Sequence, residues 1–268
     1  MSKRTWFRFE LAGLVVLAFY VLIAIVPGAF TNQDPLDQNI SSRLASPGNE
    51  HIFGTDELGR DIYTRCIYGA RSSLLVAVMA VLISTTIGVA LGLVSGYSEG
   101  AVDNFLSRAN EILISFPAII IALGLVTVVG QNVLAIAFVI GLVNTPSFFR
   151  VTRAITMQVK NLAYVDAVKT FGASTRYLLV KTILPNSYNE ILVQVLLIAS
   201  RAVIVEASLS FLGLGVPPPA PSWGGMLRVG RNFMYQNVWY SIFPGVFIVL
   251  LVLAIQFTAR YVRGGSKK

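Results

Sequence analysis

The chain has 268 residues, of which 55% are hydrophobic and only 13% are charged, with a formal net charge of +8 at pH 7. A soluble domain carries about 25% charged residues, so the composition excludes an ordinary soluble protein. Several apolar runs are long enough to cross a bilayer, and backbone groups in lipid must be satisfied internally, which favours helices. We therefore predict an all-α polytopic membrane protein with six transmembrane helices. A single cysteine and a single histidine exclude an intrachain disulfide and multi-histidine metal sites, and we predict no metal site.

The N-terminal part, residues 1–71, contains the first predicted span and an external loop. A basic head is followed by an apolar run over residues 11–26. A signal peptide would need a small-residue cleavage site, and Pro-Gly-Ala-Phe at 27–30 is a poor one, so we interpret the run as a transmembrane helix. Residues 30–71 are polar and rich in turn formers.

The end of that loop predicts an amphipathic helix at the membrane surface, capped by Thr55 or Asp56 and leading into the second span. Three apolar residues recur there at four-residue spacing, and an acid and a base lie one turn apart on another face. These residues are Leu58, Ile62 and Cys66, and Asp61 with Arg65.

Five further apolar runs predict the remaining spans, and we assign residues 72–261 to one transmembrane core. Pro146 lies in the fourth span and should kink it. Trp223, Trp239 and Tyr240 precede the last span and suit an interfacial aromatic belt. The spans are residues 74–96, 112–129, 133–149, 191–214 and 242–259, with polar connections at 97–111 and 216–240 and a basic tail at 262–268.

Small residues recur every four positions in the second span, at Ser84, Gly88, Gly92 and Gly96. Such a stripe lets two helix backbones approach closely in lipid. Two interpretations stay open: packing inside the chain, and packing against another subunit, to which we assign the four residues.

Two charges, Arg201 and Glu206, fall inside the fifth predicted span. Five residues apart on a helix they are separated by roughly 140°, so they do not form a pair on one face. Intramembrane charges are costly and often functional, which makes both residues candidate intramembrane polar sites. Pairing across helices, or a position near the end of the span, is the alternative.

Residues 164–186 interrupt the apolar pattern with three basic residues against the single acid Asp166. A helical run, a break at Gly172 and a second run that stops at Pro185 predict a polar helix-turn-helix within a loop at 150–190. With both termini in the cytoplasm, the cytoplasmic segments would hold 14 Lys and Arg and the external ones six. This bias agrees with the positive-inside rule and explains the net charge without nucleic acid. The polar element is then cytoplasmic, where it would dock a soluble partner.

Motifs for nucleotide binding and hydrolysis are absent from the sequence. The chain has no Gly-x-x-x-x-Gly-Lys-Ser/Thr, Gly-x-Gly-x-x-Gly or His-Glu-x-x-His segment. We predict no catalytic residue and interpret the protein as a conduit whose energy source is another subunit.

The polar element contains Asp-Ala-Val at 166–168, Gly-Ala-Ser at 172–174 and Ile-Leu-Pro-Asn at 183–186. Together these groups resemble the EAA loop of ABC importer permeases, with Asp and Val in place of Glu and Ala. In that family the loop forms coupling helices that dock into a cleft on the ATPase subunit, with the glycine in the tight turn between them. The resemblance assigns this ATPase-coupling role to Tyr164, Asp166, Ala167, Val168, Phe171, Gly172, Ala173, Ser174, Leu184, Pro185 and Asn186.

The chain also contains GTD at 54–56, GRD at 59–61, GARSSL at 69–74, EASLSFLGLG at 206–215 and PSWG at 221–224. In this order the segments are similar to the C-type permease subunit of dipeptide, oligopeptide and nickel importers. The basic tail departs from the family pattern.

This resemblance implies the ABC importer type I permease architecture in a bacterial inner membrane. A solute-binding protein would deliver the solute, and this chain and a second permease subunit would line the path. Two ATPase subunits would bind ATP and Mg²⁺, and this chain would hold no cofactor. Peptides are the first expected solute, while nickel, haem, glutathione and other small solutes stay open.

Other function classes stay open from the residues alone. A secondary transporter would carry inverted repeats with broken helices, and Asn-Thr-Pro at 144–146 is a candidate break without a matching second half. A structural membrane protein would show no solute flux. An intramembrane enzyme would need a nucleophile and base, for which no constellation is found.

Overall fold

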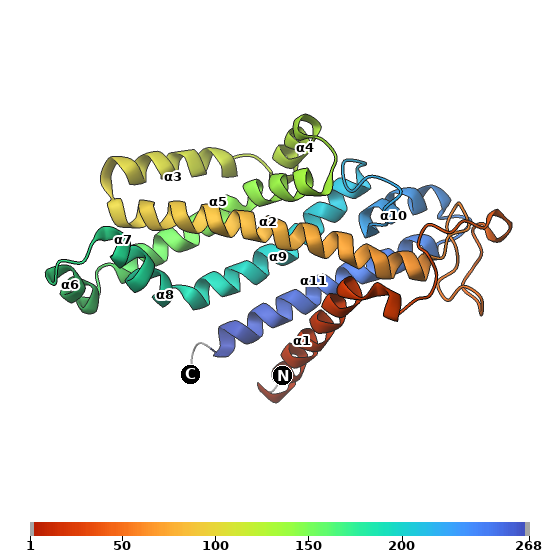
Figure 1. The fold of residues 1–268 in the computed structure, drawn as a ribbon, viewed down its shortest axis with the longest axis horizontal. Helices are drawn as coiled ribbons and strands as arrows, with labels where there is room; N and C mark the ends of the chain where they lie inside the picture. Colours follow the sequence, from red (N-terminus) through yellow and green to blue (C-terminus); the bar gives the residue numbers. More distant parts are fainter. Residues whose placement is uncertain (1–2, 266–268) are drawn as a thin grey trace.

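The computed structural model describes residues 3–265, and helices joined by loops account for this part of the chain. The long helices form an elongated bundle, with the loops between α1 and α2 at one end and α6 and α7 at the other (Figure 1). The elements are α1 (Lys3–Ile25), η1 (Pro27–Ala29), η2 (Ile40–Ser42), α2 (Ile62–Ser98), α3 (Gly100–Ile114), α4 (Ala118–Val129), α5 (Val133–Val159), α6 (Ala163–Thr170), α7 (Thr175–Tyr177), η3 (Leu178–Ile183), α8 (Leu184–Asn186), α9 (Tyr188–Phe211), α10 (Trp223–Gly230), η4 (Arg231–Phe233) and α11 (Trp239–Gly265).

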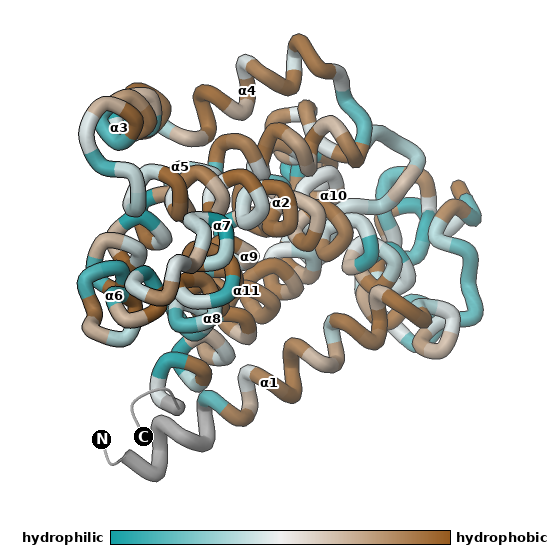
Figure 2. Tube along the Cα trace, turned by 60° about the vertical axis from the view of Figure 1, so that its left-hand side comes forward, coloured by the Kyte–Doolittle hydropathy of each residue, from teal (hydrophilic) through white to brown (hydrophobic). Residues whose placement is uncertain are grey.

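Four of the described helices, α2, α5, α9 and α11, are long and apolar enough to cross a membrane. The pair α3 and α4, bent by 89°, makes a fifth candidate, and α1 contributes a shorter apolar helix at Glu10–Ile25. The prediction of six spans therefore holds only when both the bent pair and α1 are counted. Figure 2 shows hydrophobic residues along these helices and hydrophilic ones around α6, α7 and the loops.

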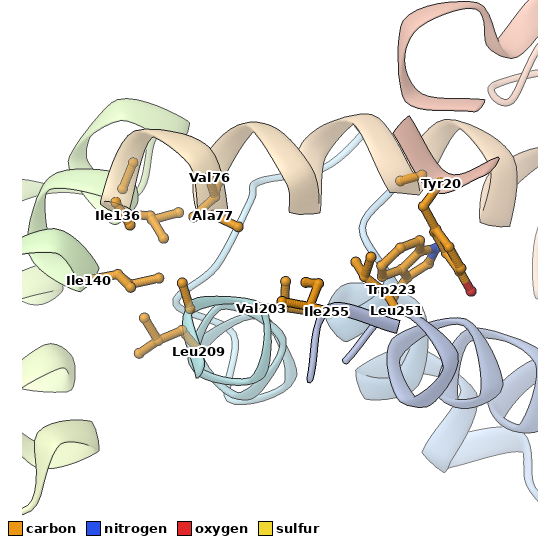
Figure 3. Packing of buried hydrophobic residues seen from close by; sticks show 14 of the residues in the cluster. Tyr20, Val76, Ala77, Ile136, Ile140, Val203, Leu209, Trp223, Leu251 and Ile255 are labelled. Atoms are coloured by element: carbon orange, nitrogen blue, oxygen red, sulfur yellow. The ribbon is translucent and has the colours of Figure 1, made fainter. Parts of the chain in front are cut away.

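The central core joins α1, α2, α5, α9 and α11. Figure 3 shows Val76 of α2 and Ile136 of α5 close together, with Val203 of α9 near Ile255 of α11. All four residues are buried, at 3% exposure or less. The core is therefore continuous from α5 through α9 to α11.

Trp223, Trp239 and Tyr240 do not form the predicted interfacial belt. Trp223 is fully buried, and its indole Nε1 donates to the carbonyl of Cys66 at 2.9 Å. Tyr240 is 1% exposed and Trp239 is 40% exposed, so only the latter is placed as a belt would require. Trp223 instead fastens α10 to the beginning of α2.

The second span is one continuous helix of 37 residues, so the predicted separate surface helix is wrong. Asp61 caps α2 by accepting the N–H of Thr64 at 2.7 Å, whereas Thr55 and Asp56 lie in the preceding loop. The predicted pairing of Arg65 with Asp61 is not found. Arg65 lies next to Asp56 instead, with 3.4 Å between Nε and Oδ2.

That preceding loop is folded around a buried carboxylate. Oδ1 of Asp56 accepts the N–H groups of Leu58 and Arg60 at 2.9 Å, and Oδ2 accepts Nε of Arg60 at 2.6 Å. Gly59 has a φ of +74°, and a Cβ there would lie 1.8 Å from the carbonyl oxygen of Asn39. The GTD and GRD segments therefore build a compact cap on the end of the bundle.

Three further boundaries differ from the predicted ones. Residues 97–111 are mostly helical, in α3, instead of a polar connection. The third span breaks at Pro117, which has no N–H to donate and disfavours a helical residue before it, so α4 covers only Ala118–Val129. In contrast, α5 runs through Pro146 to Val159, ten residues beyond the predicted end at 149.

The small-residue stripe of α2 packs against α5 inside the chain. A Cβ on Gly88 would lie 2.5 Å from Cβ of Phe148, and one on Gly92 would lie 2.7 Å from Cβ of Thr152. Gly96 meets the backbone of α5 in the same way, and Ser84 is fully buried. The assignment of Ser84, Gly88, Gly92 and Gly96 to subunit packing is therefore wrong, because α5 already covers this face.

Candidate functional site

The predicted helix-turn-helix at 164–186 is present in the structure. After α6 the chain turns at Gly172, whose φ is +80°. Oγ of Ser174 then accepts the N–H of Tyr177 at 3.3 Å and caps the second run. This run continues from α7 through the π-helical η3 into α8, so it passes Pro185 and ends one residue later.

An apolar cluster attaches this element to the long helices. Val165 of α6 and Leu178 and Ile183 of η3 are buried against Leu93 of α2 and Val159 of α5. Burying such a side chain contributes about 1.5–3 kcal/mol. The element is therefore a packed extension of α2 and α5 and not a free loop.

The outer face of the element is exposed and contains large side chains. Phe171 is 92% exposed, Tyr177 53% and Tyr164 42%. The carboxylate of Asp166 meets only Nζ of Lys169, at 3.1 Å among the described residues. Of the predicted coupling residues, Tyr164, Asp166, Ala167, Phe171, Gly172, Ser174, Pro185 and Asn186 are exposed, and Val168, Ala173 and Leu184 are partly buried.

Ion pairs that the sequence analysis missed join α2, α3 and α5 near the same end. Asp103 of α3 accepts Nε and Nη2 of Arg153 in α5, each at 2.6 Å, and Oγ of Ser95 in α2 at 2.5 Å. Lys160 at the end of α5 binds Glu99 at 2.5 Å. The only signal in the sequence was opposite charge at distant positions, which does not identify a pair.

The two intramembrane charges have different surroundings. Glu206 is fully buried, and its carboxyl group accepts hydrogen bonds from Ser73 at 3.0 Å and Ser210 at 2.8 Å. It thus joins α9 to α2. Arg201 is exposed on α9 and lines a cavity with residues of α3 and α5. As expected, the two charges do not pair with each other.

A comparison with protein families identifies the class of protein to which this bundle and its exposed tip belong. The model of the family "Binding-protein-dependent transport system inner membrane component" matches residues 88–266, which is more than half of the chain. The chain belongs to this family. It is therefore a multi-pass inner-membrane transport subunit, and its transport system also needs a second permease, ATPase subunits and a solute-binding protein.

Curated relatives cover almost the whole chain. The dipeptide transport system permease protein DppC of Alkalihalophilus pseudofirmus is 37% identical over 92% of this chain and 81% of its own length. That of Bacillus subtilis is 37% identical over 92% of this chain and 78% of its own length. The probable D,D-dipeptide permease of Escherichia coli K12 is 34% identical over 88% and 79%, respectively.

A solved structure confirms the architecture. A chain of the inward-facing MetNI methionine ABC transporter aligns with a TM-score of 0.60 over 73% of this chain and 94% of its own length. Its identity is 18%, so it shows the fold alone. The expected type I permease architecture is confirmed. Within this family ATP is hydrolysed by partner subunits, and this chain is the transport component.

Proposed function

We propose that the chain is one permease subunit of a peptide importer and that residues 164–186 couple it to an ATPase. The observation that carries the proposal is the exposed aromatic tip at Phe171 and Tyr177, mounted on a helical element packed onto α2 and α5. Exposed large apolar side chains mark protein interaction sites when they gather on one surface. The names of the curated relatives support peptides as the solute.

The assembly has a division of labour. A solute-binding protein delivers the peptide from outside, and this chain forms a heterodimer with a second permease around the path. Two ATPase subunits bind ATP and Mg²⁺. Each also binds the exposed tip of one permease, which in this chain is residues 164–186. The Lys and Arg bias supports a cytoplasmic position for both termini and for residues 164–186. The capped end around Asp56 would then face the binding protein.

Coupling follows from the rigidity of the attachment. When the ATPase subunits move on ATP binding, a tip packed on α2 and α5 carries these helices with it, because packed interfaces transmit displacement as rigid-body motion. The ion pair of Asp103 with Arg153 holds α3 to the same body. The permease then alternates between inward-open and outward-open states.

The test is a gentle-detergent purification of the tagged chain from its native membrane, followed by mass spectrometry and uptake in liposomes. We expect a second permease and P-loop ATPases to co-purify, and ATP-dependent uptake of a labelled dipeptide. Competition by excess unlabelled peptides, but not by nickel chelates, is expected. A chain that purifies without any ATPase would refute the coupling role, and competition by nickel chelates alone would refute the peptide assignment.

A further inference from the structure

Two arginines line one cavity among the spans. Arg150 of α5 and Arg201 of α9 face a cavity of about 490 Å³ beside the bend between α3 and α4. The polar side chains of Asn144 and Ser147 lie in the same wall. The remaining lining is apolar and includes Ile204, so the cavity combines two cations with hydrophobic walls.

Neither guanidinium group is neutralised within the described part of the chain. The cavity lining contains no aspartate or glutamate, and the ion pairs of the described residues do not include Arg150 or Arg201. In contrast, Arg153, one turn away on α5, is bound to Asp103. Arg201 lies inside the fifth predicted span, where a cation is costly and normally faces a partner or a water-filled path. Arg150 comes directly after the predicted end of the fourth span, and both side chains are exposed. The cavity therefore carries a formal charge of about +2 that no acid of its lining offsets, which suits an anion from outside this chain.

We propose that this cavity binds the C-terminal carboxylate of the peptide during its passage, with Arg201 and Arg150 as its ligands. The proposal rests on the peptide importer function above. A guanidinium group matches a carboxylate with two parallel hydrogen bonds. The volume falls in the range of small-molecule sites, roughly 300–1,000 Å³, whereas a single acidic side chain from a neighbouring subunit would leave most of it empty.

The chemistry also suits a transporter of varied peptides. Every unmodified linear peptide has the same terminal carboxylate, whatever its side chains are. A site that binds this group and offers otherwise apolar walls holds many sequences with similar strength, since apolar contacts discriminate weakly between side chains. The bend at Pro117 borders the cavity, so relative movement of α3, α4 and α9 would change its shape during the cycle.

The test uses the complete importer with its binding protein in liposomes and two labelled peptides of one sequence. One ends in a free carboxylate and the other in an amide, and the pair is chosen so that the binding protein binds both equally. We expect wild type to import the carboxylate form about 10- to 100-fold faster at low concentration, the range of one charge-assisted hydrogen bond. Arg201→Gln and Arg150→Gln reduce this preference, and Arg201→Lys retains part of it.

Arg228→Gln is the matched control, because Arg228 is an exposed arginine on α10, at the end of the bundle that carries the cap, and should leave the preference unchanged. Equal import of both peptides by wild type would overturn the proposal. The proposal would also be overturned if Arg201→Gln slowed the import of both peptides equally, because the two arginines would then pair with an acidic residue of the neighbouring permease. If added anionic lipid restored the lost import, the partner of the arginines would be a lipid headgroup and not the peptide. Absence of ATP-dependent uptake of either peptide by wild type would instead refute the proposed function itself.

Discussion

Replacing Gly172 with valine tests whether the turn between α6 and α7 has to keep its shape for coupling. Gly172 has a φ of +80°, and no neighbouring atom lies within 4 Å of a Cβ placed there. The substitution therefore causes backbone strain and no clash. A left-handed conformation costs about 1–2 kcal/mol for an ordinary residue and more for a β-branched one. At 1.4 kcal/mol for each factor of ten, the native turn becomes roughly 5- to 30-fold less favoured.

The strain should change the shape of the turn only, because the helices on both sides of it are each packed against the bundle. Val165 and Leu178 are buried in the cluster with α2 and α5, so the turn changes shape while the bundle stays folded. We expect Gly172→Val to reduce ATP-dependent uptake about tenfold at normal membrane levels, while ATP hydrolysis by the complex no longer responds to the loaded binding protein. Gly172→Asn should keep most of the transport, because asparagine tolerates this conformation.

Gly100→Val is the matched control for strain, since Gly100 has a φ of +62°, also faces open space and lies outside the exposed tip. It should leave coupling intact. Normal uptake by Gly172→Val at normal membrane levels would refute the reasoning. If Gly172→Asn were as defective as Gly172→Val, the docking surface would need the absence of a side chain at position 172, and the backbone conformation would not be the reason.

Three further substitutions test the packing of the fold. Gly92→Leu should lower the melting temperature of the purified protein, because overpacking against α5 costs about 1–3 kcal/mol, whereas Gly124→Leu, in open space, should not. Asp103→Asn should speed amide hydrogen exchange in α3 by weakening its pairing with Arg153, a loss of about 1.5–3 kcal/mol, and unchanged exchange would contradict the pairing. Asp56→Asn should make the cap susceptible to brief proteolysis, since breaking a buried pair costs about 3–5 kcal/mol; an intact cap would show that the carboxylate is dispensable.

Hydrophobicity alone located the long helices, because their apolar runs are longer than those of helices in soluble proteins. It did not locate the ends of α2 and α5, since both continue beyond the apolar runs into polar sequence that is buried by neighbours. The break at Pro117 was visible as a proline, but the helix of residues 100–114 was not, because its polar face resembles a loop in a window average. The turn at Gly172 was predictable because glycine and a capping serine identify it locally.

Partners across the bundle were beyond the reach of the sequence. The stripe at Gly88 and Gly92 identified a close approach of two helices, but the same pattern serves packing inside a chain and between chains. Only the position of α5 decides between them. Likewise, Glu206 was identifiable as a buried charge, whereas its bonds to Ser73 and Ser210 depend on how α2 and α9 lie together.

The length of α2 suggests how a movement at the tip reaches the far end of the bundle. At 1.5 Å per residue its 37 residues span about 55 Å, from the cap around Asp56 to the cluster that holds α6 and η3. Spin labels on the exposed residues Val180 of η3 and Ile52 should therefore keep a constant separation with and without ATP. The same label at Val180 should change its distance to a label on the partner permease. A separation between Val180 and Ile52 that changed by several ångströms would show that α2 bends during the cycle, and the coupling would then need a hinge within this helix instead of rigid-body motion.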